Sequence, residues 1–328
     1  MDKIRIAVVG SGWRSQLYVR ICRMYSERFE LTYMLCRTPE KASLMRESLG
    51  ISTTCCEEEM LSSGPDLIVV AVNKTSISDV SLHYMKKGFP VVCETPVGMS
   101  EEELSSMYRA FSEGGNLFVA EQYSFEKRNR AVTEELEGGL IGEVCCVNLS
   151  QAHEYHGFAL MRGYLGIPQD TGFSVRSVKR SLPVTRTADR YSTYEDGVVI
   201  HSERTFAFIE YEGNKVCLYD FDSQEYRSPI RLTSVHITGV RGEYRDGVFT
   251  YLDDLNHVKS RAVSAEKETD EQTVCRLLEM YYGILKEGRR EEEKALLSSA
   301  LQDAYSAILL RRAIDTGEIV YSSKREWN

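Results

Sequence analysis

Features that would place a protein in a membrane or on a nucleic acid are missing from this sequence. No apolar run approaches the roughly 20 residues that a helix needs to cross a bilayer, and no charged-then-apolar leader precedes the strand-like run that begins by residue 3. The 40 basic residues are outnumbered by 49 acidic ones, the net charge is −9, and basic residues do not cluster with aromatic ones. We therefore expect a soluble, cytoplasmic chain with neither a nucleic-acid nor a membrane partner.

Recognisable cysteine motifs are missing as well. The nine cysteines are odd in number and contain no C-x-x-C pair, since those at 55–56 and 145–146 are directly adjacent. Others, including Cys36, Cys93 and Cys217, lie inside apolar strand-like runs. These features argue against a disulfide framework and against a zinc or redox motif, and they favour reduced, buried thiols.

The most informative feature that is present is the segment 4–15, where an apolar run leads into glycines and then into a helix-like pattern. Gly10 permits a tight turn, and Gly12 leaves room for backbone N–H groups to approach a pyrophosphate at the positive end of the next helix. Ser15 replaces the third glycine of G-x-G-x-x-G and is small enough to keep helix and strand close. A purely structural turn is the alternative. The residues expected to bind a dinucleotide here are Gly10, Ser11, Gly12, Trp13 and Arg14.

Strand-like and helix-like runs alternate through the first third of the chain. The predicted strands are 29–36, 66–71, 90–93 and 117–120, and the predicted helices are 38–48, 76–87 and 100–113. This βαβ repetition predicts an α/β fold with a doubly wound parallel sheet, forming an NAD(P)-binding Rossmann domain over residues 1–122.

Residues 123–328 are predicted to form a second, sheet-rich domain. The predicted elements are a helix at 125–137, strands at 143–152, 204–211 and 216–221, and helices at 268–287 and 294–315. Period-two alternation dominates the strands. We expect an α+β domain with a large, mostly antiparallel open sheet.

Two further motifs follow in a fixed order. Cys93-Glu94-Thr95-Pro96 ends the fifth strand, and Gly-Leu-Ile-Gly-Glu-Val at 139–144 leads into the sheet domain. With the glycine turn, this order resembles the Gfo/Idh/MocA family, which includes glucose-fructose oxidoreductase and inositol dehydrogenases, over essentially the whole chain. The resemblance implies a nicotinamide dinucleotide in the first domain, a substrate on the open face of the second sheet, and hydride transfer to or from a hydroxyl or carbonyl carbon. It also implies a homodimer or homotetramer formed through that sheet.

Two positions depart from the family pattern. Where the family reads Glu-Lys-Pro, with a lysine that helps to move the hydroxyl proton, this sequence has Thr95, which cannot titrate near neutral pH. A variant subgroup with Glu-Thr-Pro, followed by a stretch like Ala-Glu-Gln-Tyr at 120–123, is similar to this chain. The family's Asp-x-Gly-x-His is represented by residues 152–156, of which only His156 matches.

Residues at the predicted strand ends are the other candidates for cofactor contact. The second strand ends without the carboxylate that binds the ribose hydroxyls in NAD-binding proteins, and Arg37 with Thr38 could instead hold a 2′-phosphate. NADP(H) is therefore the preferred cofactor, with NAD(H) as the alternative, unless Arg37 is merely solvated. The remaining candidates are Val72, Asn73, Glu94 and Gln122, with Lys74 either a second cationic contact or a solvated side chain.

Three residues are predicted to be catalytic. His156, at the start of a predicted helix, has the side-chain type suited to a general acid or base, and Tyr123 and Thr95 could donate hydrogen bonds to a substrate oxygen. For each of them packing or solvation is the alternative. His153 lies one helical turn earlier and is expected to bind substrate or to pack. No third ligand accompanies the two histidines, so no metal is expected.

Together with these residues, the resemblance implies an NAD(P)-dependent oxidoreductase acting on a small sugar or polyol. Two alternatives remain. In one, the cofactor is used transiently and the net reaction is glycoside cleavage. In the other, the protein binds the cofactor without catalysis and has a regulatory role.

Overall fold

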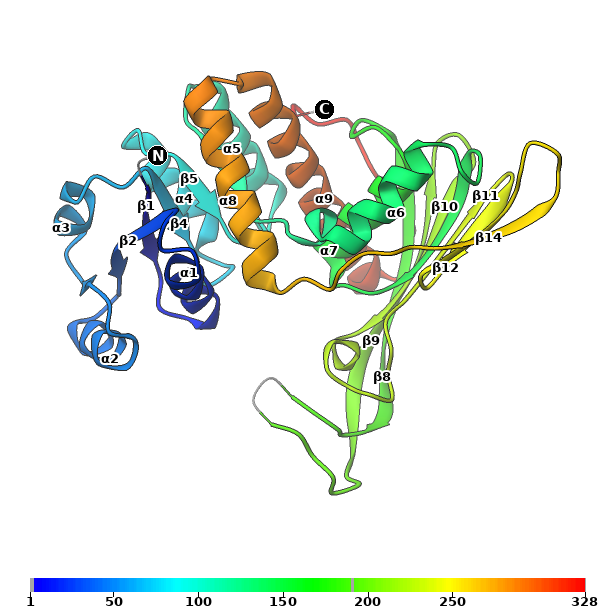
Figure 1. Cartoon of the computed structure of the whole chain (residues 1–328), viewed down its shortest axis with the longest axis horizontal. Helices are drawn as coiled ribbons and strands as arrows, with labels where there is room; N and C mark the ends of the chain where they lie inside the picture. Colours follow the sequence, from blue (N-terminus) through cyan, green and yellow to red (C-terminus); the bar gives the residue numbers. More distant parts are fainter. Residues whose placement is uncertain (1–2, 190–191, 328) are drawn as a thin grey trace. The chain divides into compact units, whose positions relative to one another are not determined.

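The computed structural model describes residues 3–189 and 192–327, whose contacts divide the chain into two compact units (Figure 1). Unit 1 takes the chain up to Phe125, together with Glu268–Ala304 and Trp327. Unit 2 takes Glu126–Lys267 and Tyr305–Glu326.

Unit 1 is built on a six-stranded parallel sheet. Its strands are β1 (Ile4–Val9), β2 (Phe29–Leu35), β3 (Thr53–Thr54), β4 (Leu67–Val70), β5 (Val91–Cys93) and β6 (Leu117–Val119). The strand order β3-β2-β1-β4-β5-β6 reverses between β1 and β4, which is the kind of place where open α/β sheets bind ligands. The doubly wound fold predicted from the sequence is confirmed. The short β3 and the helix α3 after it were not predicted, because neither presents a long periodic pattern.

The helices of unit 1 are α1 (Trp13–Met24), α2 (Pro39–Leu49), α3 (Glu57–Ser62), α4 (Ile77–Lys86), α5 (Glu101–Ser112), the 3₁₀ turn η1 (Tyr123–Phe125), α8 (Asp270–Glu287) and the first part of α9 (Arg290–Thr316). Three of them, α2, α5 and α8, begin at an N-cap residue whose side chain accepts a hydrogen bond from the first turn. Thr269 and Gln272 form a reciprocal capping box at the start of α8, and Gly288 ends this helix in the left-handed conformation.

Helix α8 shows that the predicted domain boundary was wrong for residues 268–304. Its apolar face, with Val274, Leu278 and Tyr281, is buried in the same core as β1 and α1. The Tyr281 ring stacks on Phe118 with 4.5 Å between centroids, and its hydroxyl donates to the Val119 carbonyl oxygen at 2.7 Å. The chain therefore returns to unit 1 after the second sheet, because the apolar stripe of α8 is covered there.

Unit 2 is built on a nine-stranded sheet in the order β14-β13-β12-β11-β7-β10-β9-β8-β15. Its strands are β7 (Val144–Ser150), β8 (Phe173–Thr185), β9 (Val199–Tyr211), β10 (Lys215–Asp222), β11 (Ser234–Gly239), β12 (Gly242–Arg245), β13 (Val248–Leu252), β14 (Val258–Ala262) and β15 (Val320–Tyr321). All neighbouring pairs are antiparallel except β10 with β7. The mostly antiparallel sheet predicted for this part of the chain is confirmed.

The two faces of this sheet have different surroundings. Helices α6 (Lys127–Glu137) and α7 (Glu154–Leu165) run along one face in Figure 1, and the Ser177 hydroxyl on that face donates to the Leu310 carbonyl oxygen of α9. In the part of unit 2 that the structure describes, no α-helix covers the opposite face of β8, β9 and β10. That face carries a shallow apolar hollow of about 470 Å³. Its outward side chains are those of Arg176, Val178, Phe206, Phe208, Leu218 and Asp220.

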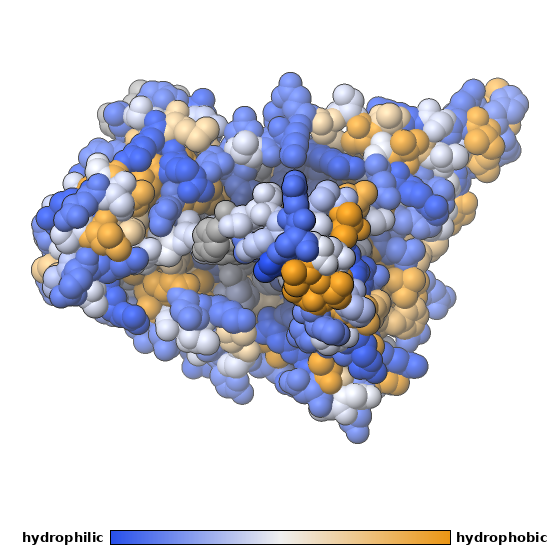
Figure 2. All heavy atoms as spheres, turned by 90° about the horizontal axis from the view of Figure 1, so that it is seen from below, coloured by the Kyte–Doolittle hydropathy of each residue, from blue (hydrophilic) through white to orange (hydrophobic). Residues whose placement is uncertain are grey.

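Most of the exposed large apolar side chains belong to unit 2, and the space-filling view of Figure 2 shows apolar patches (orange) among hydrophilic side chains. None of the helices in the described ranges is both long and apolar enough to cross a membrane. All nine cysteines are free, and Cys36, Cys93 and Cys217 are buried.

Candidate functional site

The turn between β1 and α1 contains two glycines with different tasks. Gly10 has a φ of +120°, and a Cβ there would stand 2.3 Å from the carbonyl oxygen of Ala71. Gly12 is the N-cap of α1 with extended backbone, and a Cβ there would meet nothing within 4 Å. The fold itself therefore requires Gly10, whereas the space beside Gly12 is open to a ligand.

The start of α1 is held against the sheet by hydrogen bonds. Ser15 is fully buried, and its hydroxyl donates to the Ala71 carbonyl oxygen at 3.1 Å, so it ties the first turn of α1 to the end of β4. The Gly10 N–H donates to the Leu35 carbonyl oxygen of β2 at 3.0 Å. The first turn of α1 has no acidic residue to neutralise the positive end of the helix dipole. An open glycine beside an uncompensated helix N-terminus fits the pyrophosphate of a dinucleotide.

The predicted cofactor residues of unit 1 lie at one edge of its sheet. Because all six strands are parallel, the residues that follow them meet at the carboxyl edge. The structure places at this edge the glycine turn after β1, Arg37 and Thr38 after β2, Val72 and Asn73 after β4, Glu94 and Thr95 after β5, and Gln122 and Tyr123 after β6.

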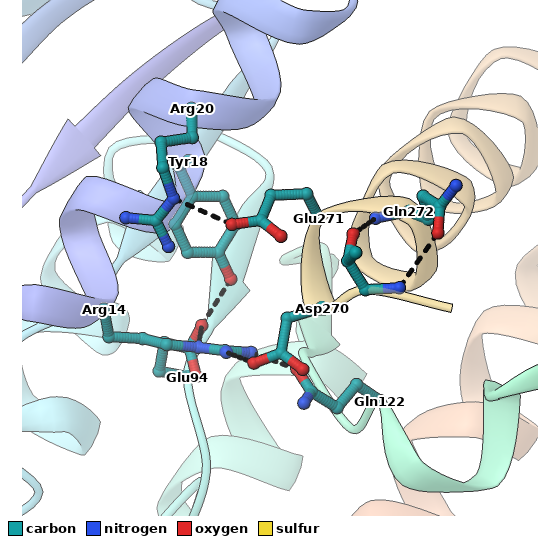
Figure 3. A network of polar contacts seen from close by, with 9 residues as sticks. Arg14, Tyr18, Arg20, Glu94, Gln122, Asp270, Glu271 and Gln272 are labelled. Carbon is teal, nitrogen blue, oxygen red and sulfur yellow. Dashed lines mark hydrogen bonds and ion pairs between the residues drawn. The ribbon is translucent and has the colours of Figure 1, made fainter. Parts of the chain in front are cut away.

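Arg14 connects three of these strand ends (Figure 3). Its Nε lies 2.6 Å from Glu94 Oε1, and its Nη2 donates to Gln122 Oε1 at 2.5 Å. A third, longer contact of 3.6 Å joins Nη1 to Asp270 Oδ2 at the start of α8. The sequence predicted Arg14, Glu94 and Gln122 as separate cofactor contacts, and the structure shows that they bind one another.

Tyr18 completes this network from inside the protein. It lies one turn after Arg14 on α1, is fully buried, and donates its hydroxyl to Glu94 Oε1 at 2.5 Å. Burial, reinforced by the Glu94 carboxylate, raises the pKa of Tyr18 well above its usual value. Burial by itself would lower the pKa of Arg14, but the opposing effects of Glu94, Tyr18 and Asp270 together outweigh it, and the pKa of the guanidinium is raised. Tyr18 therefore stays a neutral donor and Arg14 a cation.

Sequence reasoning missed Tyr18 and Asp270. The spacing of Arg14 and Tyr18 places both on one face of α1, which is the one signal that could have linked them. Asp270 lies 256 positions after Arg14 in the numbering, and no local pattern connects such residues.

The end of β2 presents Arg37 and Thr38 on the surface. Both are exposed, and the Thr38 hydroxyl accepts a hydrogen bond of 3.3 Å from the N–H of Lys41 as the N-cap of α2. Cys36, directly before them, is buried. Thr38 thus caps α2, a structural role that the sequence analysis did not assign. Arg37 lies directly before this cap.

The remaining candidates of unit 1 occupy loops after β4, β5 and β6. Asn73 accepts hydrogen bonds at its Oδ1 from the N–H and the hydroxyl of Thr75, both at 3.2 Å, and Lys74 beside it is exposed. Thr95 is partly exposed directly after the buried Glu94. Tyr123 begins η1, and its N–H donates to Glu121 Oε1 at 2.8 Å.

The two predicted histidines lie in unit 2, at the start of α7. His153 is the exposed N-cap residue, and His156 is partly exposed one turn further on. The helix itself was predicted, including its end at Gly166, which adopts the left-handed conformation. The His153 ring contacts Phe221 and Tyr226, two residues that the sequence analysis did not single out. Over residues 3–189 and 192–327, no group of three His, Cys, Asp or Glu side chains could hold a metal ion.

Comparison with known proteins finds a family match for the first domain. Residues 4–122 match the Gfo/Idh/MocA family model, described as an oxidoreductase family with an NAD-binding Rossmann fold. Among curated proteins, no sequence matches the chain.

Solved structures share the fold over nearly the whole chain. One is an oxidoreductase from Agrobacterium radiobacter in complex with NAD+, L-tartaric acid and magnesium, with 15% identity and a TM-score of 0.74 over 97% of this chain and 98% of that one. Another is the WlbA dehydrogenase from Bordetella pertussis in complex with NADH and UDP-GlcNAcA, with 18% identity and a TM-score of 0.72 over 99% and 100% of the two chains. An oxidoreductase from Thermotoga maritima has 19% identity and a TM-score of 0.71 over 98% of each chain.

These identities show a shared fold, and the family model adds the cofactor class of the first domain. The resemblance stated from the order of the motifs is confirmed. Residues 4–122 therefore form a Rossmann domain of the Gfo/Idh/MocA oxidoreductase family, which is described as NAD-binding, and the rest of the chain shares the fold of the solved structures.

Proposed function

We propose that this protein transfers a hydride between NADP(H), in preference to NAD(H), and a hydroxyl or carbonyl carbon of a small carbohydrate-like compound. The observation that carries the proposal is the turn at Gly12, which is open to a ligand at the uncompensated N-terminus of α1. The substrate class is supported by the relative crystallised with UDP-GlcNAcA and by the one crystallised with L-tartaric acid.

The preference for NADP(H) rests on the end of β2. No carboxylate stands at Cys36, Arg37 or Thr38, and the exposed Arg37 is free to form charge-assisted bonds with a 2′-phosphate. We place the pyrophosphate at residues 10–14 and the nicotinamide half near Glu94 and Gln122. Val72 and Asn73, which follow β4, are assigned to the wall of the same cofactor site.

The chain's own contribution to the reaction is to orient the substrate and to move a proton. Nicotinamide supplies or accepts the hydride when it is bound. We assign hydrogen bonding of the substrate oxygen to Thr95 and Tyr123, and general acid or base catalysis to His156, because threonine cannot titrate near neutral pH. His153 is assigned to substrate binding.

Thr95 also favours a second candidate, a cofactor-binding protein without catalysis. In this candidate, the lysine position has lost its function while the cofactor site persists. It predicts dinucleotide binding with no turnover on any sugar or polyol.

We further propose that the uncovered face of β8, β9 and β10 pairs with a second copy of the chain. Phe206, Phe208 and Leu218 place apolar surface there, and Arg176 and Asp220 border it with opposite charges. An apolar centre with a charged rim is typical of interfaces between protein subunits.

Titration with NADPH and NADH tests the central proposal. Trp13, exposed at the first position of α1, is a suitable donor for energy transfer to reduced nicotinamide. We expect tighter binding of NADPH, and we expect Arg37→Asp to abolish this preference while Lys86→Asp, an exposed charge reversal on α4, retains it. Failure of both nucleotides to bind would contradict the oxidoreductase assignment. Binding without turnover on a panel of sugars and polyols would support the second candidate.

A further inference from the structure

The ends of β2 and β3 bring two cysteines to opposite positions. The two strands are parallel, and their register pairs Leu35 with Thr54. The next step of this register sets Cys36 opposite Cys55, and the Cys36 N–H continues the ladder with a 2.8 Å hydrogen bond to the Thr54 carbonyl oxygen. The two cysteines lie 19 positions apart in the sequence, so no short cysteine motif marks them.

This arrangement suits a disulfide bond. Neighbouring strands lie about 4.8 Å apart, and the Cα atoms of bonded cysteines are usually about 4.4–6.8 Å apart. Thr53, two residues before Cys55, donates its hydroxyl to the Ala42 carbonyl oxygen of α2, and Cys36 is buried in the same apolar cluster as Ala42. Because side chains alternate along a strand, Cys55 belongs to the α2 side of the sheet, as Cys36 does.

The two thiols differ in their access to solvent. Cys55 is exposed, whereas Cys36 is only 3% exposed. Burial raises the pKa of the Cys36 thiol, and Lys41 and the Ser11 hydroxyl act in the opposite direction. The Cys55 thiol also raises this pKa. These effects weaken with distance, so all three groups lie near the Cys36 sulfur. An oxidant in solution therefore meets Cys55 first, with Cys36 behind it.

The adjacent Cys56 has another partner. It is the N-cap residue of α3, and its sulfur donates to Glu58 Oε2 at 3.3 Å. The Cα atoms of adjacent residues are about 3.8 Å apart, which is shorter than the distance that disulfides usually span. Cys36 is therefore the partner that the geometry offers to Cys55.

We propose that Cys36 and Cys55 are a modification site at which a hydroperoxide forms a disulfide, and that this disulfide weakens binding of the dinucleotide. The Cys55 thiolate attacks a peroxide oxygen and becomes a sulfenic acid, and the other peroxide oxygen leaves as water or an alcohol. Cys36 then attacks the Cys55 sulfur, and the sulfenic oxygen leaves as water. The two thiols together lose two electrons and two protons, which the hydroperoxide takes up as its O–O bond breaks.

The effect on the dinucleotide rests on the proposed function. Cys36 directly precedes Arg37, to which we assign the 2′-phosphate, and its sulfur lies near Ser11 of the glycine turn. A covalent bond to Cys55 fixes this sulfur to the end of β3 and displaces the segments on either side of the cofactor. The oxidised chain should therefore bind NADPH more weakly and recover on reduction.

Disulfide mapping of the full chain tests the modification. The reduced protein is treated with hydrogen peroxide, its remaining thiols are alkylated, and its peptides are analysed by mass spectrometry without reduction. We expect peptides linked through Cys36 and Cys55, which dithiothreitol separates. Cys55→Ser should remove the link, whereas Cys56→Ser, at the adjacent exposed thiol, is the matched control and should keep it. In Cys36→Ser, Cys55 should stop at the sulfenic acid, which dimedone traps.

NADPH binding is measured on the same samples. Oxidation should raise the dissociation constant about three- to tenfold in the wild type and in Cys56→Ser, and dithiothreitol should restore it. Oxidation should leave the dissociation constant of Cys55→Ser unchanged. Two results would overturn the inference: wild-type Cys55 that bonds to another cysteine or stays a sulfenic acid, and a mapped disulfide that leaves NADPH affinity unchanged. Failure of the reduced protein to bind NADPH contradicts the proposed function instead, and the peptide map still decides whether the disulfide forms.

Discussion

The contact between Arg14 and Glu94 offers the sharpest test of the network in unit 1. Their side chains are only 16% and 9% exposed, and they lie 2.6 Å apart. Replacing Arg14 with Gln leaves the Glu94 carboxylate buried without its cation. Tyr18 still donates to Glu94 Oε1 and compensates part of the loss.

The magnitude follows from the burial. Removing one partner of a buried ion pair costs about 3–5 kcal/mol, and the remaining Tyr18 bond reduces this to about 2–4 kcal/mol for Arg14→Gln. Glu94→Gln leaves Arg14 its contacts with Gln122 and Asp270, so we expect a cost of about 1–2 kcal/mol. The double variant should cost about 1–2 kcal/mol less than the sum of the single ones, because the two side chains interact directly.

Urea unfolding followed by circular dichroism measures these free energies. The ion pair of Arg20 on α1 with Glu271 on α8 is the control. Arg20 is 49% exposed, so Arg20→Gln should cost less than about 1 kcal/mol. Additive costs in the Arg14 and Glu94 variants would refute the network, and so would an Arg14→Gln cost no larger than that of Arg20→Gln.

Three further predictions concern the turn, the open sheet face and a buried carboxylate. Gly10→Ala should strongly lower the melting temperature, because the added Cβ would clash with the Ala71 carbonyl oxygen and the backbone has a positive φ. Gly12→Ala should leave the melting temperature nearly unchanged and weaken NADPH binding about tenfold or more. Equal loss of thermal stability in the two variants would contradict their separate roles. Phe208→Asp should lower the molar mass measured by light scattering, and Leu255→Asp, at an exposed turn, should not. Burial raises the pKa of Glu225 above its unfolded value, so its stabilising contribution is complete below about pH 4 and is lost as the pH rises through the folded value. Between about pH 4 and pH 7 the unfolding free energy of the wild type should therefore fall relative to that of Glu225→Gln, and urea titrations that show the reverse trend would disprove this.

The fold of the first domain was predictable because its signals are local. Buried parallel strands are continuous apolar runs, and glycines such as Gly50 end helices in the left-handed conformation. Helix α8 was also predicted as a helix, but its assignment to unit 1 was not. An apolar stripe specifies that a face will be buried and does not specify which sheet buries it.

The second sheet was harder to predict in detail. Strand β8 exposes Arg176 and Arg180 on one face and Lys179 on the other, so its alternation of apolar and polar residues is weak. Strand β14 is exposed along its whole length and shows no apolar pattern. Both strands form by pairing with neighbouring strands, and the local pattern of apolar and polar residues does not predict such pairing.

The sequence identified the residue types at the cofactor edge but not their partners. The bonds of Arg14 to Glu94 and Gln122 join residues 80 and 108 positions apart. They depend on the strand order and on the side chains that meet at the edge. The ring contact of His153 with Tyr226 was missed for the same reason, because Tyr226 follows a different strand from the one that leads to His153.

The partners of Glu94 also bear on the missing lysine at Thr95. Arg14 and Tyr18 both hold the carboxylate directly before Thr95, so the chain is fixed there whichever side chain stands at position 95. A site that had decayed together with its lysine would have no reason to keep a buried cation, a buried phenol and an amide around this one carboxylate, because buried polar groups are costly unless every member is satisfied. The intact network therefore favours a working cofactor site in which the proton follows another route over a degenerate scaffold. How the carboxylate before Thr95 is held in place and which residue moves the proton are therefore separate questions.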